Sequence, residues 1–257
     1  MIYFIYFLLY AFVFLLGICI GSFLNVIVYR IPKKISIAKG RSFCPDCNTK
    51  IKDYDLIPIL SFLFLKGKCR NCKKEISLRY PFVEMLTGVL AVLIFINFDF
   101  TAKAFLAFAF CAILVAITLI DYDTMEIPNS LIIAIIPLAI ISYFLFPEIS
   151  LLDRAIGFVC VSVPMLLLTM LIPDCFGGGD IKLLAVSGLI LGWKYILLAT
   201  FIGILIEGAY VIIKMLLKKL KKGDHIAFGP ALCAGIYLSL LYGDKILKWY
   251  FSFFRIS

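Results

Sequence analysis

Two aspartates stand at the ends of apolar segments in this chain of 257 residues. Asp121 follows the run "AILVAITLI", and Asp180 follows three glycines in "CFGGGDIKLLA" and begins another apolar run. Two carboxylates that share a site do not ionise together easily, so one stays protonated while the other acts as a base toward water. The glycines let a backbone come close to Asp180. The pair therefore indicates hydrolysis of the aspartic-protease type.

The same carboxylates also have simpler explanations. An Asp at a helix start is often only an N-cap, and "DYDTMEIPN" at 121–129 would also suit a polar interfacial loop. Ionisable groups at membrane depth mark ion or proton paths, to which Glu207 in a later apolar run would contribute. Asp123 is a weaker alternative to Asp121, because two residues further on it faces another side. The residues alone leave hydrolysis, an ion path and helix capping open.

The composition places these carboxylates in a membrane protein. Hydrophobic residues make up 63% of the chain and the mean hydropathy is +1.08, whereas apolar residues approach half of a soluble domain. The apolar runs have the roughly 17–25 residues needed to cross a bilayer, so we expect an all-α polytopic membrane protein with about eight transmembrane helices. Their expected spans are 3–28, 80–98, 103–121, 130–147, 152–172, 180–192, 194–217 and 226–242.

Two of these spans have special features. The first is too long and too aromatic for a cleaved signal peptide, so we expect it to stay as helix one. The span 180–192 has 13 residues, which make about 20 Å of helix and are short for a crossing. We expect this helix to be recessed in a thinned or water-filled part of the membrane, which suits a site.

Positive charge predicts the orientation of the chain. Thirteen of its 25 Lys and Arg residues lie between Arg30 and Arg79, and with four acidic residues the segment carries +9, as much as the whole chain. By the positive-inside rule this segment is cytoplasmic. Counting crossings from it puts Asp121 and Asp180 at the cytoplasmic side. A second basic cluster falls on the same side and consists of Lys218, Lys219, Lys221 and Lys222.

Four cysteines of the basic segment have the spacing of a zinc ribbon. They form two CxxC pairs with 21 residues between them, and they are Cys44, Cys47, Cys69 and Cys72. Flanking Lys and Arg favour thiolates, and a metal would supply much of the stability of so small a fold. Disulfides and unligated thiols are the alternatives, although a cytosolic loop is reducing. We expect helix one at 1–29, a small cytoplasmic zinc-ribbon-like domain at 30–79 and membrane-embedded helices at 80–257.

Six sequence blocks, in this order, resemble the type IV prepilin peptidase family. They are "GSFLNVIVYRIP" at 21–32, the CxxC pairs with "YDLIPILSFLFLKGKC" between them, "RYPFVEMLTG" at 79–88, "LIDYDTMEIPN" at 119–129, "GGGDIKLLA" at 177–185 and "FGPALCAG" at 228–235. Each block alone would be weak evidence. Together they cover nearly the whole chain in the right order and topology.

The resemblance implies a multi-pass aspartic protease of the bacterial inner membrane with its active site facing the cytoplasm. Its substrates would be type IV prepilins or pseudopilins, whose basic leader it removes, and its catalytic residues would be Asp121 and Asp180. Members with the full cysteine loop also methylate the new amino terminus with S-adenosylmethionine, so we expect both activities here. Many members carry an aromatic residue where this chain has Gly178.

The methyl-donor site is less well marked, because the chain has no glycine-rich Rossmann fingerprint. The best candidates are Gly67, Lys68 and Glu84, although Glu84 would equally suit a pair with Arg79 or Arg30. An ion or proton transporter with a zinc-bearing cytoplasmic domain is the alternative function. No nucleic-acid partner is expected, because the topology already explains the basic charge of the loop.

Four further polar residues have structural explanations. We expect Asn25 to form a helix–helix hydrogen bond, with a place in the site as the alternative, and Lys182 to extend to the membrane interface. Arg154 is interpreted as marking only a membrane boundary, and His225 as a solvated loop residue.

Overall fold

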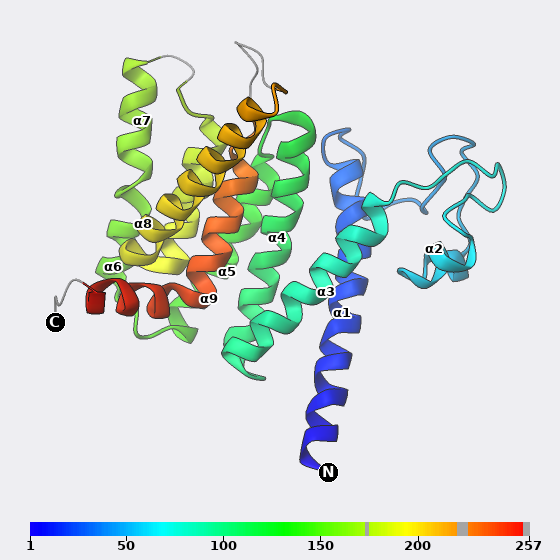
Figure 1. Ribbon diagram of the computed structural model, residues 1–257, viewed down its shortest axis with the longest axis horizontal. Coiled ribbons are helices and arrows are strands. Elements are labelled where there is room, and N and C mark those ends of the chain that lie inside the picture. Colours follow the sequence, from blue (N-terminus) through cyan, green and yellow to red (C-terminus); the bar gives the residue numbers. More distant parts are fainter. Residues whose placement is uncertain (173–174, 220–225, 254–257) are drawn as a thin grey trace. The chain divides into compact units, whose positions relative to one another are not determined.

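The computed structural model describes residues 1–172, 175–219 and 226–253, and this part of the chain is helical (Figure 1). Its elements in chain order are α1 (Ile2–Arg30), the short 3-10 helix η1 (Asp53–Leu56), α2 (Leu60–Phe64), α3 (Arg79–Phe98), α4 (Ala102–Thr124), α5 (Asn129–Leu145), α6 (Leu151–Val159), α7 (Ser162–Leu171), α8 (Gly178–Leu216) and α9 (Gly229–Phe253). Within the described residues, β-structure is limited to two isolated bridges, so the expected all-α fold is confirmed. The chain forms two compact units, Met1–Ala104 and Phe105–Ser257.

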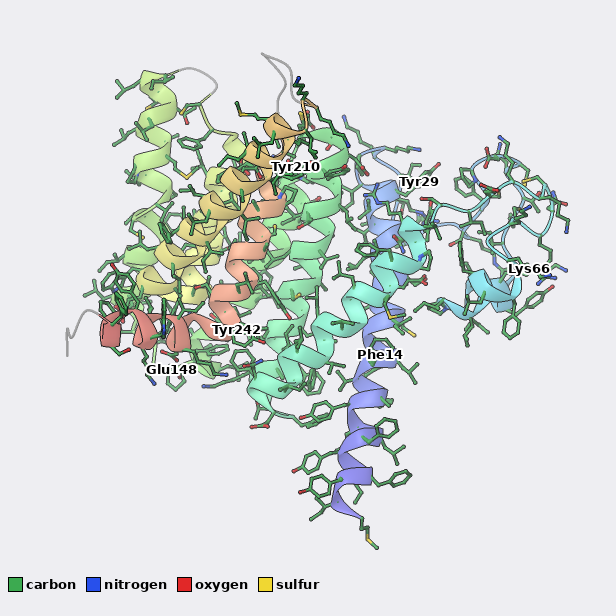
Figure 2. The ribbon with its side chains drawn as sticks, in the orientation of Figure 1. Phe14, Tyr29, Lys66, Glu148, Tyr210 and Tyr242 are labelled. Carbon is green, nitrogen blue, oxygen red and sulfur yellow. The ribbon has the colours of Figure 1, made fainter. Side chains whose placement is uncertain are left out.

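In the first unit, α1 and α3 approach each other through small residues. A Cβ atom added at Gly17 would lie 2.7 Å from the Cα of Gly88, and one added at Gly21 would lie 2.8 Å from the Cα of Glu84. Phe14, labelled on α1 in Figure 2, covers Gly88 from the other helix. Small residues at such contacts let helix backbones pack closely in membranes, where the hydrophobic effect does not hold helices together.

A polar contact joins the same two helices close to the segment that contains the four cysteines, residues 31–78, which is called the four-cysteine segment below. The side-chain amide of Asn25 on α1 donates to the carbonyl oxygen of Tyr80 on α3 at 3.2 Å. The expectation of a helix–helix hydrogen bond at Asn25 is therefore confirmed.

The second unit is built on α4. The side chains of Phe110, Ile117 and Ile120 on this helix are fully buried. A core helix of this kind is apolar on most sides, and its only acidic residues lie in its last turn. The apolar part of α4 that forms the core therefore ends at Asp121, the first candidate carboxylate.

The long helix α8 reverses direction at Gly192. This residue has φ +74° and ψ 172°, which no helix contains, and glycine adopts that conformation at little cost. A straight helix would separate Asp180 from Glu207 by about 40 Å, yet both interact electrostatically with Asp121. The helix therefore consists of a short first arm and a returning second arm (Figure 1), which correspond to the expected spans 180–192 and 194–217.

Arg154 holds the C-terminal end of the first arm of α8 through hydrogen bonds. Its buried guanidinium donates to the hydroxyl of Ser142 at 2.7 Å, to the Phe146 carbonyl at 3.0 Å and to the Leu189 carbonyl at 2.6 Å. These carbonyls lie at the C-terminal ends of α5 and of the first arm, where helices leave acceptors without partners. The interpretation of Arg154 as only a boundary marker is wrong, because it satisfies helix ends that sequence alone does not bring together.

Five segments of the described chain are long and apolar enough to cross a membrane, namely α1, α3, α4, Leu151–Leu171 and α8. They identify the chain as a membrane protein. The eight expected spans are not confirmed: five segments have the length and hydropathy of a crossing, α8 is interrupted at Gly192, and α5 has only 17 residues.

Candidate active site and metal centre

The two predicted catalytic carboxylates lie at neighbouring helix ends of the second unit. Asp121 is in the last turn of α4 and Asp180 is in the first turn of α8, and both are buried. They are close enough for a direct electrostatic interaction. The structure thus brings together two acidic residues that are far apart in the sequence.

Each aspartate also faces the positive end of a helix. The Oδ2 of Asp121 accepts a hydrogen bond from the backbone N–H of Gly229 at 2.9 Å, and Gly229 is the first residue of α9. Asp180 lies in the first turn of its own helix, where a carboxylate is favoured. Its buried Oδ1 has no hydrogen-bond partner among the described residues, so this oxygen is available to a ligand or a water molecule.

The glycines beside the pair have different surroundings. A Cβ atom at Gly177 would lie 2.8 Å from the Oδ2 of Asp180, and one at Gly179 would lie 2.8 Å from the Cβ of Ile127, whereas one at Gly178 would meet nothing within 4 Å. The site therefore requires the first and third glycines and leaves space over the second.

Gly229 is a residue of this site that the sequence interpretation missed. A Cβ atom there would lie 2.6 Å from the Oδ2 of Asp121, so only glycine can present its N–H to this carboxylate. The signal in the sequence was "FGPALCAG", in which Gly and Pro precede an apolar run and predict a helix start.

Other polar residues of the second unit have the following positions. Asp123 is exposed whereas Asp121 is buried. Glu207 has a buried Oε1 without a hydrogen-bond partner among the described residues, and it interacts electrostatically with Asp121. Lys182 reaches the side-chain oxygen of Asn129 at 3.0 Å. His225, Lys221 and Lys222 lie outside the described residues.

The four cysteines of the first unit form a cluster. The Sγ atoms of Cys44, Cys47, Cys69 and Cys72 all lie within 4.8 Å of one another, and those of Cys44 and Cys72 are 3.9 Å apart. Four sulfurs around a tetrahedral zinc, with Zn–S bonds of about 2.3 Å, are about 3.8 Å apart. The cluster therefore fits a zinc ion.

The two CxxC pairs have the same local structure. The first is flanked by a bridge between Phe43 and Lys50 and the second by a bridge between Lys68 and Glu75. Each pair is followed by a residue with positive φ, Asn48 at 55° and Lys73 at 61°. This repeated turn directs both sulfurs of a pair toward one point, as a shared ion requires.

The surroundings of two cysteines favour the thiolate that binds metal. The side chain of Thr49, the backbone of the same residue and Asn71 lower the pKa of Cys47 to about 6. Backbone hydrogen bonds from Cys72 and Asn71 lower the pKa of Cys69. Cys47 is therefore present as a thiolate near neutral pH, and the thiolate is the form that coordinates a soft metal.

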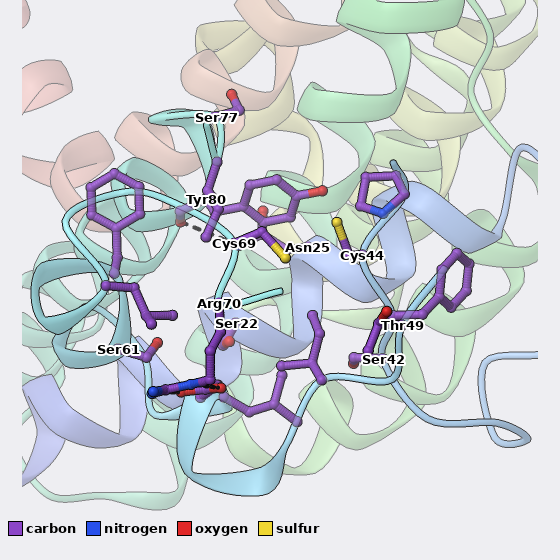
Figure 3. Close-up of a pocket in the computed structure, with 18 of the residues that line it drawn as sticks. Ser22, Asn25, Ser42, Cys44, Thr49, Ser61, Cys69, Arg70, Ser77 and Tyr80 are labelled. Carbon is purple, nitrogen blue, oxygen red and sulfur yellow. Dashed lines mark hydrogen bonds and ion pairs between the residues drawn. The ribbon is translucent and has the colours of Figure 1, made fainter. Parts of the chain in front are cut away.

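A cavity of about 620 Å³ lies between the four-cysteine segment, α1 and α3 of the first unit. Figure 3 shows Ser22 and Asn25 from α1, Tyr80 from α3, and Cys44, Cys69 and Arg70 from the four-cysteine segment around it. Glu84 also lines the cavity, whereas Gly67 and Lys68 are not among its lining residues.

Glu84 is held by neutral groups. Its Oε2 accepts from the backbone N–H of Ile59 at 2.8 Å, and the carboxylate also hydrogen-bonds with Ser22. Arg30, one partner considered for it, donates instead to a set of carbonyl oxygens, those of Ser36, Ile37, Lys39, Gly40 and Arg41. The alternative of a Glu84–Arg30 pair is therefore wrong, because the backbone of residues 36–41 wraps around the guanidinium.

Comparison with known proteins gives two matching family models. The model of the bacterial peptidase A24 N-terminal domain matches residues 15–98, and that of the type IV leader peptidase family matches residues 108–212. A Bacillus subtilis (strain 168) protein named prepilin leader peptidase/N-methyltransferase is 37% identical over 241 residues, which cover 92% of this chain and 96% of that protein.

Proteins of the same name from two other bacteria are also similar. The one from Pseudomonas aeruginosa is 32% identical over 267 residues, covering 93% of this chain and 92% of its own length. The one from Legionella pneumophila is 30% identical over 273 residues, covering 95% of each. No solved structure matches the chain.

Proposed function

We propose that this chain, which belongs to the type IV leader peptidase family and is a prepilin leader peptidase and N-methyltransferase, cuts its substrates with Asp121 and Asp180. The observation that supports the proposal is the burial of both carboxylates at neighbouring ends of α4 and α8, where they interact electrostatically. The substrates of the chain are type IV prepilins or pseudopilins, as the names of the relatives suggest.

The mechanism needs one ionised and one protonated carboxylate. Asp121 takes a proton from the attacking water as general base, because the Gly229 N–H that donates to its Oδ2 at 2.9 Å favours the ionised carboxylate. Asp180, whose buried Oδ1 has no hydrogen-bond partner among the described residues, stays protonated and donates its proton to the scissile carbonyl. The tetrahedral intermediate then breaks its C–N bond: the proton held by Asp121 passes to the leaving amine, and a hydroxyl proton of the intermediate returns to Asp180. No covalent enzyme intermediate forms.

The topology supports cleavage at the cytoplasmic edge of a bacterial inner membrane. If both arms of α8, α5 and α9 each cross, the chain has eight crossings. The basic segment between Arg30 and Arg79 is then cytoplasmic, and the aspartate pair lies on the same side. The domain division at 1–29, 30–79 and 80–257 follows this topology. A prepilin joins a basic leader to an apolar helix, so its scissile bond lies at that depth.

The four cysteines would hold zinc, and S-adenosylmethionine would supply the methyl group for the new amino terminus. The sulfur geometry supports the first assignment. The second rests on the name shared by the relatives. The chain's own residues for methyl transfer are expected in the first unit, which carries Glu84.

The catalytic assignment is tested with Asp121→Asn and Asp180→Asn in membranes that contain a prepilin. Each variant should lose about a thousandfold or more in cleavage rate, as removal of a catalytic group does. Asp123→Asn is the matched control, because it makes the same change two residues away on the exposed side of α4. Mass spectrometry of the prepilin amino terminus measures leader loss and methylation together.

Normal leader removal by both the Asp121 and the Asp180 variants would refute the proposal. A transporter is the alternative function, and it predicts proton or ion flux through liposomes containing the purified chain. That flux would depend on the same aspartates and on Glu207, and it would occur without any prepilin.

A further inference from the structure

We propose that the cavity of the first unit binds the methyl donor, S-adenosylmethionine, and that Glu84 is the carboxylate that anchors it. This inference rests on the proposed function, since it names the site for the second activity. It concerns only residues between Ser22 and Glu84, so it can fail while the aspartate pair remains catalytic.

The size and walls of the cavity suit a nucleoside-type ligand. Ligand sites usually have volumes of roughly 300–1,000 Å³, and this cavity has about 620 Å³. Four aromatic side chains line it, namely Tyr29, Phe43, Phe62 and Tyr80. A flat base packs well against such rings, while the polar groups of α1 and the four-cysteine segment reach the sugar and amino-acid parts.

Glu84 is prepared for a cationic or hydroxyl-bearing ligand. It is only 7% exposed, and the hydrogen bonds from Ile59 and Ser22 come from neutral groups that do not offset its charge. A buried carboxylate is costly unless a cation or further donors approach it. S-adenosylmethionine brings both, because it has a positive sulfonium, an ammonium group and ribose hydroxyls.

The backbone that holds Glu84 is strained. Ile59 has φ 60° and ψ −52°, a conformation that is an outlier for a β-branched residue. Strain of this kind persists where the surroundings require it and is concentrated at ligand sites. Here it turns the Ile59 N–H onto the Oε2 of Glu84 at 2.8 Å, so the carboxylate has a fixed orientation toward the cavity.

The metal cluster forms part of the same cavity. Cys44 and Cys69 line it, and so does Arg70, which follows Cys69 and forms a two-point pair with Asp55 at 2.9 and 2.7 Å. Zinc binding orders a fold that has little core of its own. The donor site is therefore complete only when the four cysteines hold their ion, and the two bindings are linked.

The test measures the binding of S-adenosylmethionine to the purified, zinc-loaded full chain, by calorimetry and by thermal shift. Glu84→Gln should weaken binding about tenfold or more, as loss of a charged hydrogen-bond acceptor does. Asp53→Asn is the matched control, because Asp53 is an exposed acid of the same unit that does not line the cavity. Removal of zinc with a chelator should abolish binding in the unchanged protein.

Prepilin cleavage by the same samples separates the possible failures. Glu84→Gln should keep cleavage and zinc content, which shows that it folds, while its affinity for the donor and its methylation rate at low donor concentration fall. Unchanged donor affinity in Glu84→Gln, or binding that survives zinc removal, would overturn the inference without touching the peptidase assignment. Conversely, Asp180→Asn should keep donor binding, so loss of cleavage there concerns the peptidase site alone.

Discussion

The glycines around the aspartate pair give a quantitative prediction. Carbon and oxygen atoms are comfortable at about 3.3–3.6 Å, whereas a Cβ atom at Gly229 would lie 2.6 Å from the Asp121 carboxylate and one at Gly177 would lie 2.8 Å from that of Asp180. Gly229→Ala and Gly177→Ala must therefore move a carboxylate by about 0.5–1 Å. Because a displacement of 1 Å costs about a hundredfold in rate, we expect losses of about tenfold to a hundredfold, or about 1.4–2.7 kcal/mol in activation free energy.

Gly178→Ala is the internal control, since a Cβ atom there meets nothing within 4 Å. It should keep cleavage within about twofold, because it leaves both carboxylates in place. The assay is the initial rate of leader removal from a prepilin in detergent, with the thermal midpoint of each variant measured alongside. Equal rates for Gly229→Ala, Gly177→Ala and Gly178→Ala at equal stability would refute the close packing of glycine against the carboxylates.

Two further predictions concern stability and the metal centre. Arg154→Leu should destabilise the protein by about 2–5 kcal/mol, because it leaves buried carbonyls at the ends of α5 and the first arm of α8 without a donor; an unchanged thermal midpoint in detergent would contradict this role. After zinc removal, Cys47 should become open to alkylation, and its rate should fall as the pH drops through about 6, the value to which Thr49 and Asn71 lower its pKa. Thr49→Val should move this fall to higher pH, because the thiolate loses the hydroxyl that stabilises it, and an unshifted profile or no protection by zinc would count against the cluster.

The sequence predicted those features that depend on local patterns. The spacing of the four cysteines predicted a cluster, and the structure places their sulfurs within 4.8 Å of one another. The run of apolar residues from Asp180 predicted a short helix ending near Gly192, and the chain does reverse there. Each of these patterns involves residues close together in the sequence, so that glycine, cysteine spacing and hydropathy directly determine the local backbone conformation.

Contacts between distant segments were not predictable in this way. Nothing near Gly229 in the sequence indicates that its N–H meets Asp121, which is 108 positions earlier. Likewise, the partners of Arg154 belong to two other helices, and the N–H partner of Glu84 is a strained Ile59. Such contacts arise only after the helices pack, because they satisfy backbone groups that each helix end leaves open.

The fastening of the first arm of α8 has a consequence for how a substrate reaches the site. Arg154 holds the far end of this arm, and a Cβ atom at Gly188 would collide with the Gly157 carbonyl of α6, so the arm is tightly packed at two points. We therefore expect the arm to keep its place when a substrate binds, so that the prepilin adapts to it. Its helix has to unwind around the scissile bond so that an extended strand can pass over the open space at Gly178. Prepilins whose cleavage region unwinds easily should therefore be cut fastest.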